Sequence, residues 1–144
     1  TPEQRALYDV VLAAQEAAIA QVRPGIRRSA FHDTAVRTIV EGLIDVGLLA
    51  GSVDENVERE TYRDYYMHGT GHWLGLDVHD VGLMHEPFAP GWVLTVEPGV
   101  YIPDEGFGIR LENNVLVTEA GPIDLMAQIP VEAEEIEALM RAGK

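Results

Sequence analysis

The sequence predicts an α+β fold for the chain of 144 residues. Two observations carry this prediction. Apolar residues recur with the helical period through the first part of the chain, and short alternating segments bounded by glycine and proline follow from residue 92. Helices first and a hairpin later is the order typical of α+β domains. Hydrophobic residues make up 47% and charged residues 24%, which is ordinary for one globular domain with a real core.

The first predicted helix covers residues 3 to about 22, where apolar side chains recur at i, i+3, i+4 and i+7. Pro24 and Gly25 follow it as a stop signal. Ser29 is a suitable N-cap for a second helix, and Gly47 is its expected end. The expected buried face of this second helix consists of Phe31, Ala35, Ile39, Leu43 and Val46.

A short third helix is expected after Ser52, because Ser52 and Glu55 have the spacing of a capping box. Residues 92–102 then indicate a strand interrupted by Pro98 and Gly99, and residues 107–119 alternate like a second strand. Residues 120–122 predict a turn.

The last helix has acidic residues early and Arg141 late, as the helix dipole favours. No repeat or linker divides the chain, so residues 1–144 are expected to form one domain.

The charge balance, the lengths of the apolar runs and the absence of cysteine together exclude several classes of protein. Aspartate and glutamate outnumber lysine and arginine by 24 to 10, giving a net charge of −14, and phosphate binding needs a basic patch instead. No apolar run reaches the roughly 20 residues that a membrane span requires. The chain has no cysteine, which excludes a disulfide framework and a thiolate nucleophile. We therefore expect a cytoplasmic protein that binds neither nucleic acid nor membrane.

Two glutamates occupy positions where a free carboxylate would be costly. Glu97 lies inside an apolar segment, and alternation places Glu112 on the same strand face as Gly108 and Arg110. Each carboxylate would need a cation as a partner if it is buried. Arg110 in a structural salt bridge and a bound metal ion are both open at this point.

Three histidines lie within twelve residues, at His68, His72 and His79. His68 and His72 have the spacing of zinc ligands on a helix, but the glycines between them predict a loop, so the two need not share one metal. If strand alternation holds, His79 lies on one face with Gly75 and Asp77. Three histidines beside two glutamates favour a functional site over satisfied core residues. His32 and His85 are expected to be structural or exposed.

Three segments in order, HGTGHWLGLDVHDVG, LTVEPGVYIP and GIRLENNVLVTEAG, resemble the catalytic domain of Xaa-Pro aminopeptidases (the aminopeptidase P family). These are metallopeptidases of pita-bread fold, related to prolidase. The resemblance covers essentially the whole chain. It implies the C-terminal half of a pita-bread domain, with helices packed on a curved, mainly antiparallel sheet.

The resemblance also implies roles for individual residues. The metal ligands it implies are His72, Glu97 and the bridging Glu112. His68 and His79 correspond to the histidines that contact the substrate, and Arg110 corresponds to an arginine that orders the carboxylates. Asp77 and Asp80 are expected to hold the loop and orient the histidines. The implied metal is Mn²⁺, with Co²⁺ or Zn²⁺ as substitutes, and the implied substrate is a peptide with proline at its second position.

The family's site needs two further aspartates on strands that this sequence does not contain. We therefore expect three of five ligands here, with the N-terminal domain and the aspartate-bearing strands absent. The chain alone is expected to bind at most one metal ion weakly and to hydrolyse little. The pseudo-symmetry of the fold suggests a homodimer. The alternatives are an Xaa-Pro dipeptidase (prolidase), and a non-catalytic pita-bread module with a binding or structural role.

Overall fold

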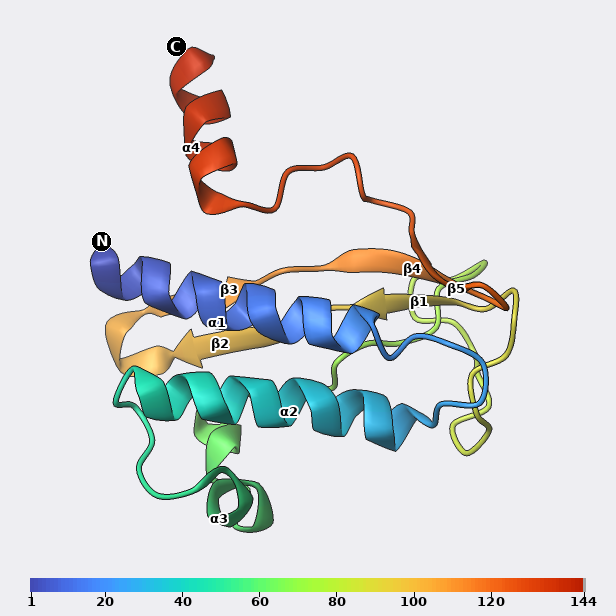
Figure 1. Cartoon of the computed structure of the whole chain (residues 1–144), viewed down its shortest axis with the longest axis horizontal. Coiled ribbons are helices and arrows are strands. Elements are labelled where there is room, and N and C mark those ends of the chain that lie inside the picture. Colours follow the sequence, from blue (N-terminus) through green and yellow to red (C-terminus); the bar gives the residue numbers. More distant parts are fainter. Residues whose placement is uncertain (144) are drawn as a thin grey trace.

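The computed structural model describes residues 1–143, with helices first and strands later (Figure 1). The helices are α1 (Pro2–Ile19), α2 (Arg28–Asp45), α3 (Val53–Glu58) and α4 (Ala133–Ala142), with short 3-10 turns η1 (Thr61–Asp64) and η2 (Pro103–Glu105). The strands are β1 (Val93–Val96), β2 (Gly99–Ile102), β3 (Phe107–Arg110), β4 (Asn113–Thr118) and β5 (Gly121–Asp124). The predicted α+β class is confirmed.

Helix α1 begins with a capping box between Thr1 and Gln4. Helix α3 has the predicted capping box between Ser52 and Glu55. Each box satisfies backbone N–H groups that the first turn of a helix leaves without an internal partner. The two local signals therefore fix where these helices start.

Helix α2 differs from its prediction at both ends. It begins at Arg28, because the extended backbone of Arg27 (φ −84°, ψ 148°) makes that residue the N-cap, so Ser29 lies inside the first turn. Val46 is the C-cap and is 37% exposed, not part of the buried face. Gly47 ends the helix as expected, because its φ of +80° is accessible to glycine at little cost.

The two predicted strand segments pair with each other antiparallel. Val96 pairs with Asn113 across β1 and β4, and Gly99 pairs with Arg110 across β2 and β3. The register continues without a shift from one pair of strands to the other, so the four strands form one long interrupted hairpin. The interruption lies at residues 97–98 on one side and 111–112 on the other.

The prediction of one strand over residues 107–119 is therefore wrong in its continuity. The segment divides into β3 and β4 because its partner is broken at Pro98, which has no N–H to donate to the ladder. The turn predicted at residues 120–122 forms at residues 119–120, and Gly121 and Pro122 already belong to β5, which pairs with β4. These strands form a three-stranded sheet, β1-β4-β5, and a two-stranded sheet, β2-β3.

Helices α1 and α2 run side by side along the strands (Figure 1). They approach closely at Gly42, where a Cβ would lie 2.5 Å from a methyl group of Val10. One buried cluster packs them against β2, and includes Val11, Leu43 and Val100. A second cluster fills the space beneath β1 and β4, so each part of the broken hairpin has its own core.

Helix α4 stands away from the body of the protein (Figure 1), and none of its residues is buried. Its contacts with the body include an ion pair between Glu134 and Arg5. Next to it, the Tyr8 hydroxyl donates a hydrogen bond to the Val131 carbonyl. In residues 1–143, no helix has both the length and the apolar composition that crossing a membrane would require.

Candidate metal centre

The histidine-rich segment lies against the free edge of β1, opposite β4. Glu97 N–H donates to the Thr70 carbonyl at 2.7 Å, and Thr95 N–H donates to the His72 carbonyl at 2.9 Å. Gly71 lies between these bonds, and a Cβ there would fall 1.9 Å from the Thr95 carbonyl oxygen. Glycine is required because the two backbones approach too closely for any side chain. The segment is a loop, as the glycines predicted.

His72 is oriented with one ring nitrogen toward the carboxylates. Its Nδ1 lies 2.9 Å from the Trp73 carbonyl oxygen, and since a carbonyl only accepts, Nδ1 must carry the proton. In the neutral ring Nε2 then keeps its lone pair, the form in which histidine binds metal. Nε2 lies 3.3 Å from Oε1 of Glu97. Two acceptors facing each other at this distance are arranged as two ligands of one cation would be.

Glu97 and Glu112 lie at the interruption of the hairpin. The continuous register places them directly opposite each other, where like charges destabilise a pair of strands. Ligand atoms of His72, Glu97 and Glu112 all lie within 4.8 Å of one another. The Thr95 hydroxyl donates to Glu97 at 3.0 Å and accepts from His72 N–H at 2.9 Å, fixing both residues. One histidine with two carboxylates is a donor set that suits a divalent cation.

Glu112 differs from its expected surroundings. It was expected within an apolar strand, but it lies in the link between β3 and β4 and is exposed. Glu97 is also outside a strand, although it is largely buried, with 14% of its side chain accessible. The break in the hairpin therefore takes the two carboxylates out of the ladder and lets both face the same point.

His68 and His79 line the same cleft as His72. The ring of His79 meets that of His72 edge to face, with centroids 4.2 Å apart. Nδ1 of His68 donates to the Gly69 carbonyl at 2.8 Å, and Nε2 of the neutral ring accepts from the Tyr101 hydroxyl at 2.8 Å. The strand expected around His79 does not form, and His79 reaches this position from the loop.

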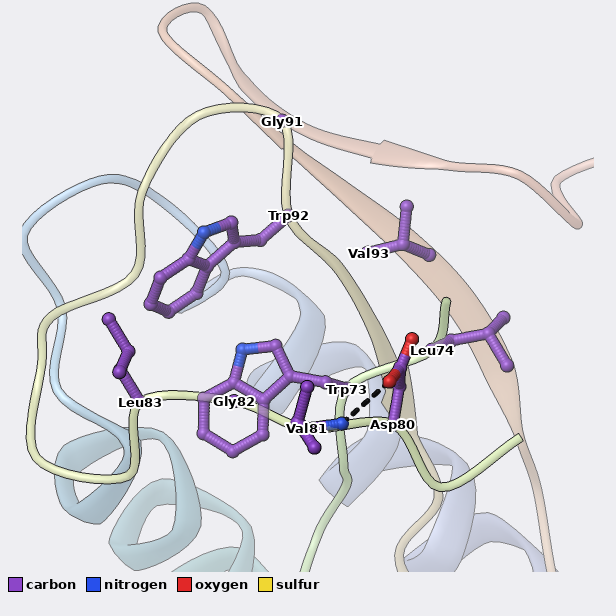
Figure 2. Close-up of a pocket in the computed structure, with 9 residues that line it drawn as sticks. All are labelled: Trp73, Leu74, Asp80, Val81, Gly82, Leu83, Gly91, Trp92 and Val93. Carbon is purple, nitrogen blue, oxygen red and sulfur yellow. Dashed lines mark hydrogen bonds between the residues drawn. The ribbon is translucent and has the colours of Figure 1, made fainter. Parts of the chain in front are cut away.

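Asp80 holds that loop, as expected. Its carboxylate accepts from the N–H groups of Leu76 and Val81, both at 2.7 Å. Figure 2 shows the Val81 bond and, beside it, the indole of Trp73 edge to face with Trp92. A Cβ on Gly82 would overlap the Trp73 ring at 2.0 Å. The orienting contacts expected from Asp77 and Asp80 to the histidines are absent from the described residues.

Five of the six predicted residues line one cleft of about 350 Å³, and Glu112 is the exception, since it approaches His72 and Glu97 without lining the cleft. Its lining comprises Arg28, His68, Gly69, Gly71, His72, His79, Glu97 and Arg110. Arg110 makes no ion pair with a carboxylate in residues 1–143, so it shares the cleft without the expected bond to the glutamates. Sequence reasoning missed Arg28, Thr95 and Tyr101. The alternation of β2 could have indicated Tyr101, whereas no local signal marks Arg28.

A hydrogen-bonded chain of two buried residues and the partly buried His32 holds the same loop at Thr70. The Thr70 hydroxyl lies 2.7 Å from Nδ1 of His32 and 2.7 Å from the Tyr66 hydroxyl. Burial lowers the pKa of His32 and raises the pKa of Tyr66, because both charged forms lose hydration. His32 is therefore a structural residue, in agreement with its prediction, and His85 is exposed.

An α+β fold that gathers one histidine and two carboxylates beside further histidines defines a protein with a candidate divalent-metal site. Metallopeptidase family M24 matches residues 1–119. The chain belongs to that family.

Individual relatives agree with this assignment. The chain is 44% identical to the Xaa-Pro aminopeptidase of Escherichia coli strain K12, over 100% of this chain and 35% of that relative. It is 35% identical to the Xaa-Pro dipeptidase of Homo sapiens, over 97% of this chain and 37% of that relative. A solved structure of zinc-substituted E. coli aminopeptidase P in complex with product superposes with a TM-score of 0.95 at 44% identity. The superposition covers 100% of this chain and 36% of the E. coli chain. This match confirms the predicted pita-bread fold.

The chain spans about 35% of the length of the curated Xaa-Pro aminopeptidases it matches. The family membership and the fold are therefore established for this chain. Activity and substrate belong to a longer protein in those relatives.

Proposed function

We propose that this chain supplies part of the metal centre and part of the substrate cleft of an Xaa-Pro aminopeptidase. The single observation that carries the proposal is the convergence of His72, Glu97 and Glu112 ligand atoms within 4.8 Å. The identity of 44% to the E. coli Xaa-Pro aminopeptidase, against 35% to the human dipeptidase, supports an aminopeptidase over a prolidase. The substrate is then a peptide with proline at its second position.

His72, Glu97 and Glu112 would hold the metal. We propose Mn²⁺, with Co²⁺ or Zn²⁺ as substitutes, because oxygen-rich ligation with a single imidazole suits a harder ion. A divalent ion there supplies a nucleophile at neutral pH and polarises the scissile carbonyl.

His68 and His79 would act on the peptide from the wall of the cleft that they share with His72. A neutral imidazole there can donate to a developing oxyanion or accept the proton that the nucleophile releases. In this structure His68 is held by Gly69 and Tyr101, so it exchanges the Tyr101 hydroxyl for the substrate when it acts. Arg110 contributes positive charge at the wall of the cleft.

The same proposal includes limits on the isolated chain. Three ligands satisfy one ion incompletely, so 144 residues alone are expected to bind at most one metal ion weakly and to hydrolyse little. The missing aspartate strands, the homodimer suggested by pseudo-symmetry and a cytoplasmic location are parts of this proposal that rest on the family resemblance. Light scattering at micromolar concentration tests the homodimer.

The test measures metal binding and peptide hydrolysis separately. Calorimetry with Mn²⁺ compares the unaltered chain with His72→Ala and with His85→Ala, a matched loss of an exposed imidazole outside the cleft. We expect His72→Ala to abolish binding and His85→Ala to leave it unchanged. Equal affinities for all three would contradict the assignment of the ligands.

Hydrolysis is measured with Mn²⁺ on an Xaa-Pro-Xaa tripeptide and an Xaa-Pro dipeptide. The assay compares this chain with a version extended by the upstream aspartate-bearing region. Turnover of the tripeptide only in the extended version is the expected result. Turnover restricted to the dipeptide favours prolidase, and no turnover in either version would favour the non-catalytic module.

A further inference from the structure

Arg28 is a partly buried arginine in the wall of the candidate cleft. Its guanidinium carbon lies 5.3 Å from the centroid of the Trp73 ring, and Nη1 lies 3.7 Å from the sulfur of Met84. It lines the same cleft as His72 and Glu97. Trp73 and Met84 therefore hold the charged group between an aromatic face and a thioether, which restricts its motion.

No carboxylate in residues 1–143 lies within 4.0 Å of this guanidinium. Arg110 in the same cleft likewise has no carboxylate at this distance, whereas Arg37 and Arg63 outside the cleft, both about half exposed, pair with carboxylates. Burial lowers the pKa of Arg28, because the charge loses hydration. The charge of Glu97 offsets part of this loss, although no carboxylate of the described residues lies within ion-pair distance. A partly buried guanidinium held at an aromatic ring in a cleft, with no carboxylate partner, is suited to bind a ligand carboxylate.

We propose that Arg28 binds a carboxylate of the peptide in the cleft. The planar guanidinium offers parallel N–H donors that match a carboxylate, and its position on Trp73 reduces the entropy lost on binding. The carboxylate is either the free C-terminus of a short substrate or an acidic side chain beyond the proline. This inference rests on the proposed function, because it takes the cleft as the peptide site.

A purely structural role for Arg28 is the competing explanation. Its stacking on Trp73 would then stabilise the loop, and its removal would lower the stability without changing which peptides bind. The two explanations differ in one measurable quantity, the preference for a carboxylate over its neutral amide.

The experiment measures peptide affinity by calorimetry on the protein at its natural length, with a chelator present so that no metal binds the carboxylate. The peptides are Ala-Pro-Ala, its C-terminal amide, and the amide of Ala-Pro-Glu. We expect the unaltered protein to bind Ala-Pro-Ala about tenfold more tightly than its amide, the scale of one charge-assisted pair at a half-exposed site.

Arg28→Gln is expected to remove this tenfold preference while binding the amide as before. Arg28→Lys keeps the charge without the planar fork, so it should retain part of the preference. The matched control is Arg27→Gln, which removes a neighbouring charge whose Nη1 donates to the His85 carbonyl at 2.8 Å. It should keep the full preference.

A tenfold preference for the Ala-Pro-Glu amide over the Ala-Pro-Ala amide, lost in Arg28→Gln, would assign the carboxylate to a substrate side chain. Equal affinities for acid and amides in the unaltered protein would overturn the inference without any variant. Absence of binding at millimolar peptide, or a preference that survives in Arg28→Gln, would also overturn it. The tripeptide hydrolysis assay with Mn²⁺ is independent of this calorimetry. Hydrolysis without a carboxylate preference would contradict only the inference, whereas absence of hydrolysis would contradict the proposed function.

Discussion

Replacing Gly71 with alanine is expected to separate the histidine loop from β1. The added Cβ would lie 1.9 Å from the Thr95 carbonyl oxygen, an atom of the backbone that no rotamer change can move. Relief of the overlap breaks the two flanking hydrogen bonds, from Glu97 N–H and Thr95 N–H. Each bond contributes about 0.5–1.5 kcal/mol, and overpacking of this kind costs about 1–3 kcal/mol.

The expected loss for Gly71→Ala is therefore about 3 kcal/mol in the free energy of unfolding, or about 10 °C in Tm for a chain of this size. The assay is thermal unfolding followed by circular dichroism, together with Mn²⁺ calorimetry, since His72 moves with the loop. Gly69→Ala is the control in the same loop, where a Cβ would meet only the flexible Nη2 of Arg28 at 3.4 Å. A Tm for Gly71→Ala within about 2 °C of the control would refute the close approach.

The remaining predictions concern the core, the buried histidine and the ligand support. Leu43→Ala, at a fully buried position, should lower the free energy of unfolding by about 3 kcal/mol in urea titrations. Leu139→Ala, at 55% exposure, should change it by under about 0.5 kcal/mol. Burial lowers the pKa of His32, so the unfolded chain binds more protons below about 6.5. Stability should be full above that pH and fall as the pH drops further, and His32→Gln should reduce this fall; equal pH profiles would contradict the assignment. Thr95→Val removes the hydroxyl that joins two ligands, and Mn²⁺ affinity should fall about tenfold by calorimetry.

Sequence reasoning succeeded where the signal is local. The capping box at Ser52 and the chain reversal at Gly47 depend on a few neighbouring residues, and both are present. The start of α2 was misplaced because Ser29 is a better cap chemically than Arg27, yet the backbone of Arg27 is extended by its place after the turn. A local preference of a fraction of a kcal/mol yields to such tertiary constraints.

The sequence predicted which residues belong to the candidate site better than it predicted how they are arranged. Periodicity placed Glu97 and Glu112 in strands, but their approach depends on a hairpin register that spans residues far apart in sequence. Arg28 gave no signal at all, since its position in the cleft arises from the packing of α2 against the loop of Trp73. Long-range placement of this kind is decided by the whole core.

The break in the hairpin makes the candidate centre sensitive to mechanical bending. Glu97 and Glu112 lie in the two links between the sheets, at the point about which one sheet would tilt against the other. His72 is fixed to β1 through Thr95, so a tilt of one sheet against the other would change the direction of both carboxylates relative to His72. The metal-binding geometry is thus tied to the curvature of the sheet, and whatever flattens or deepens that curvature changes the reach of both ligands together.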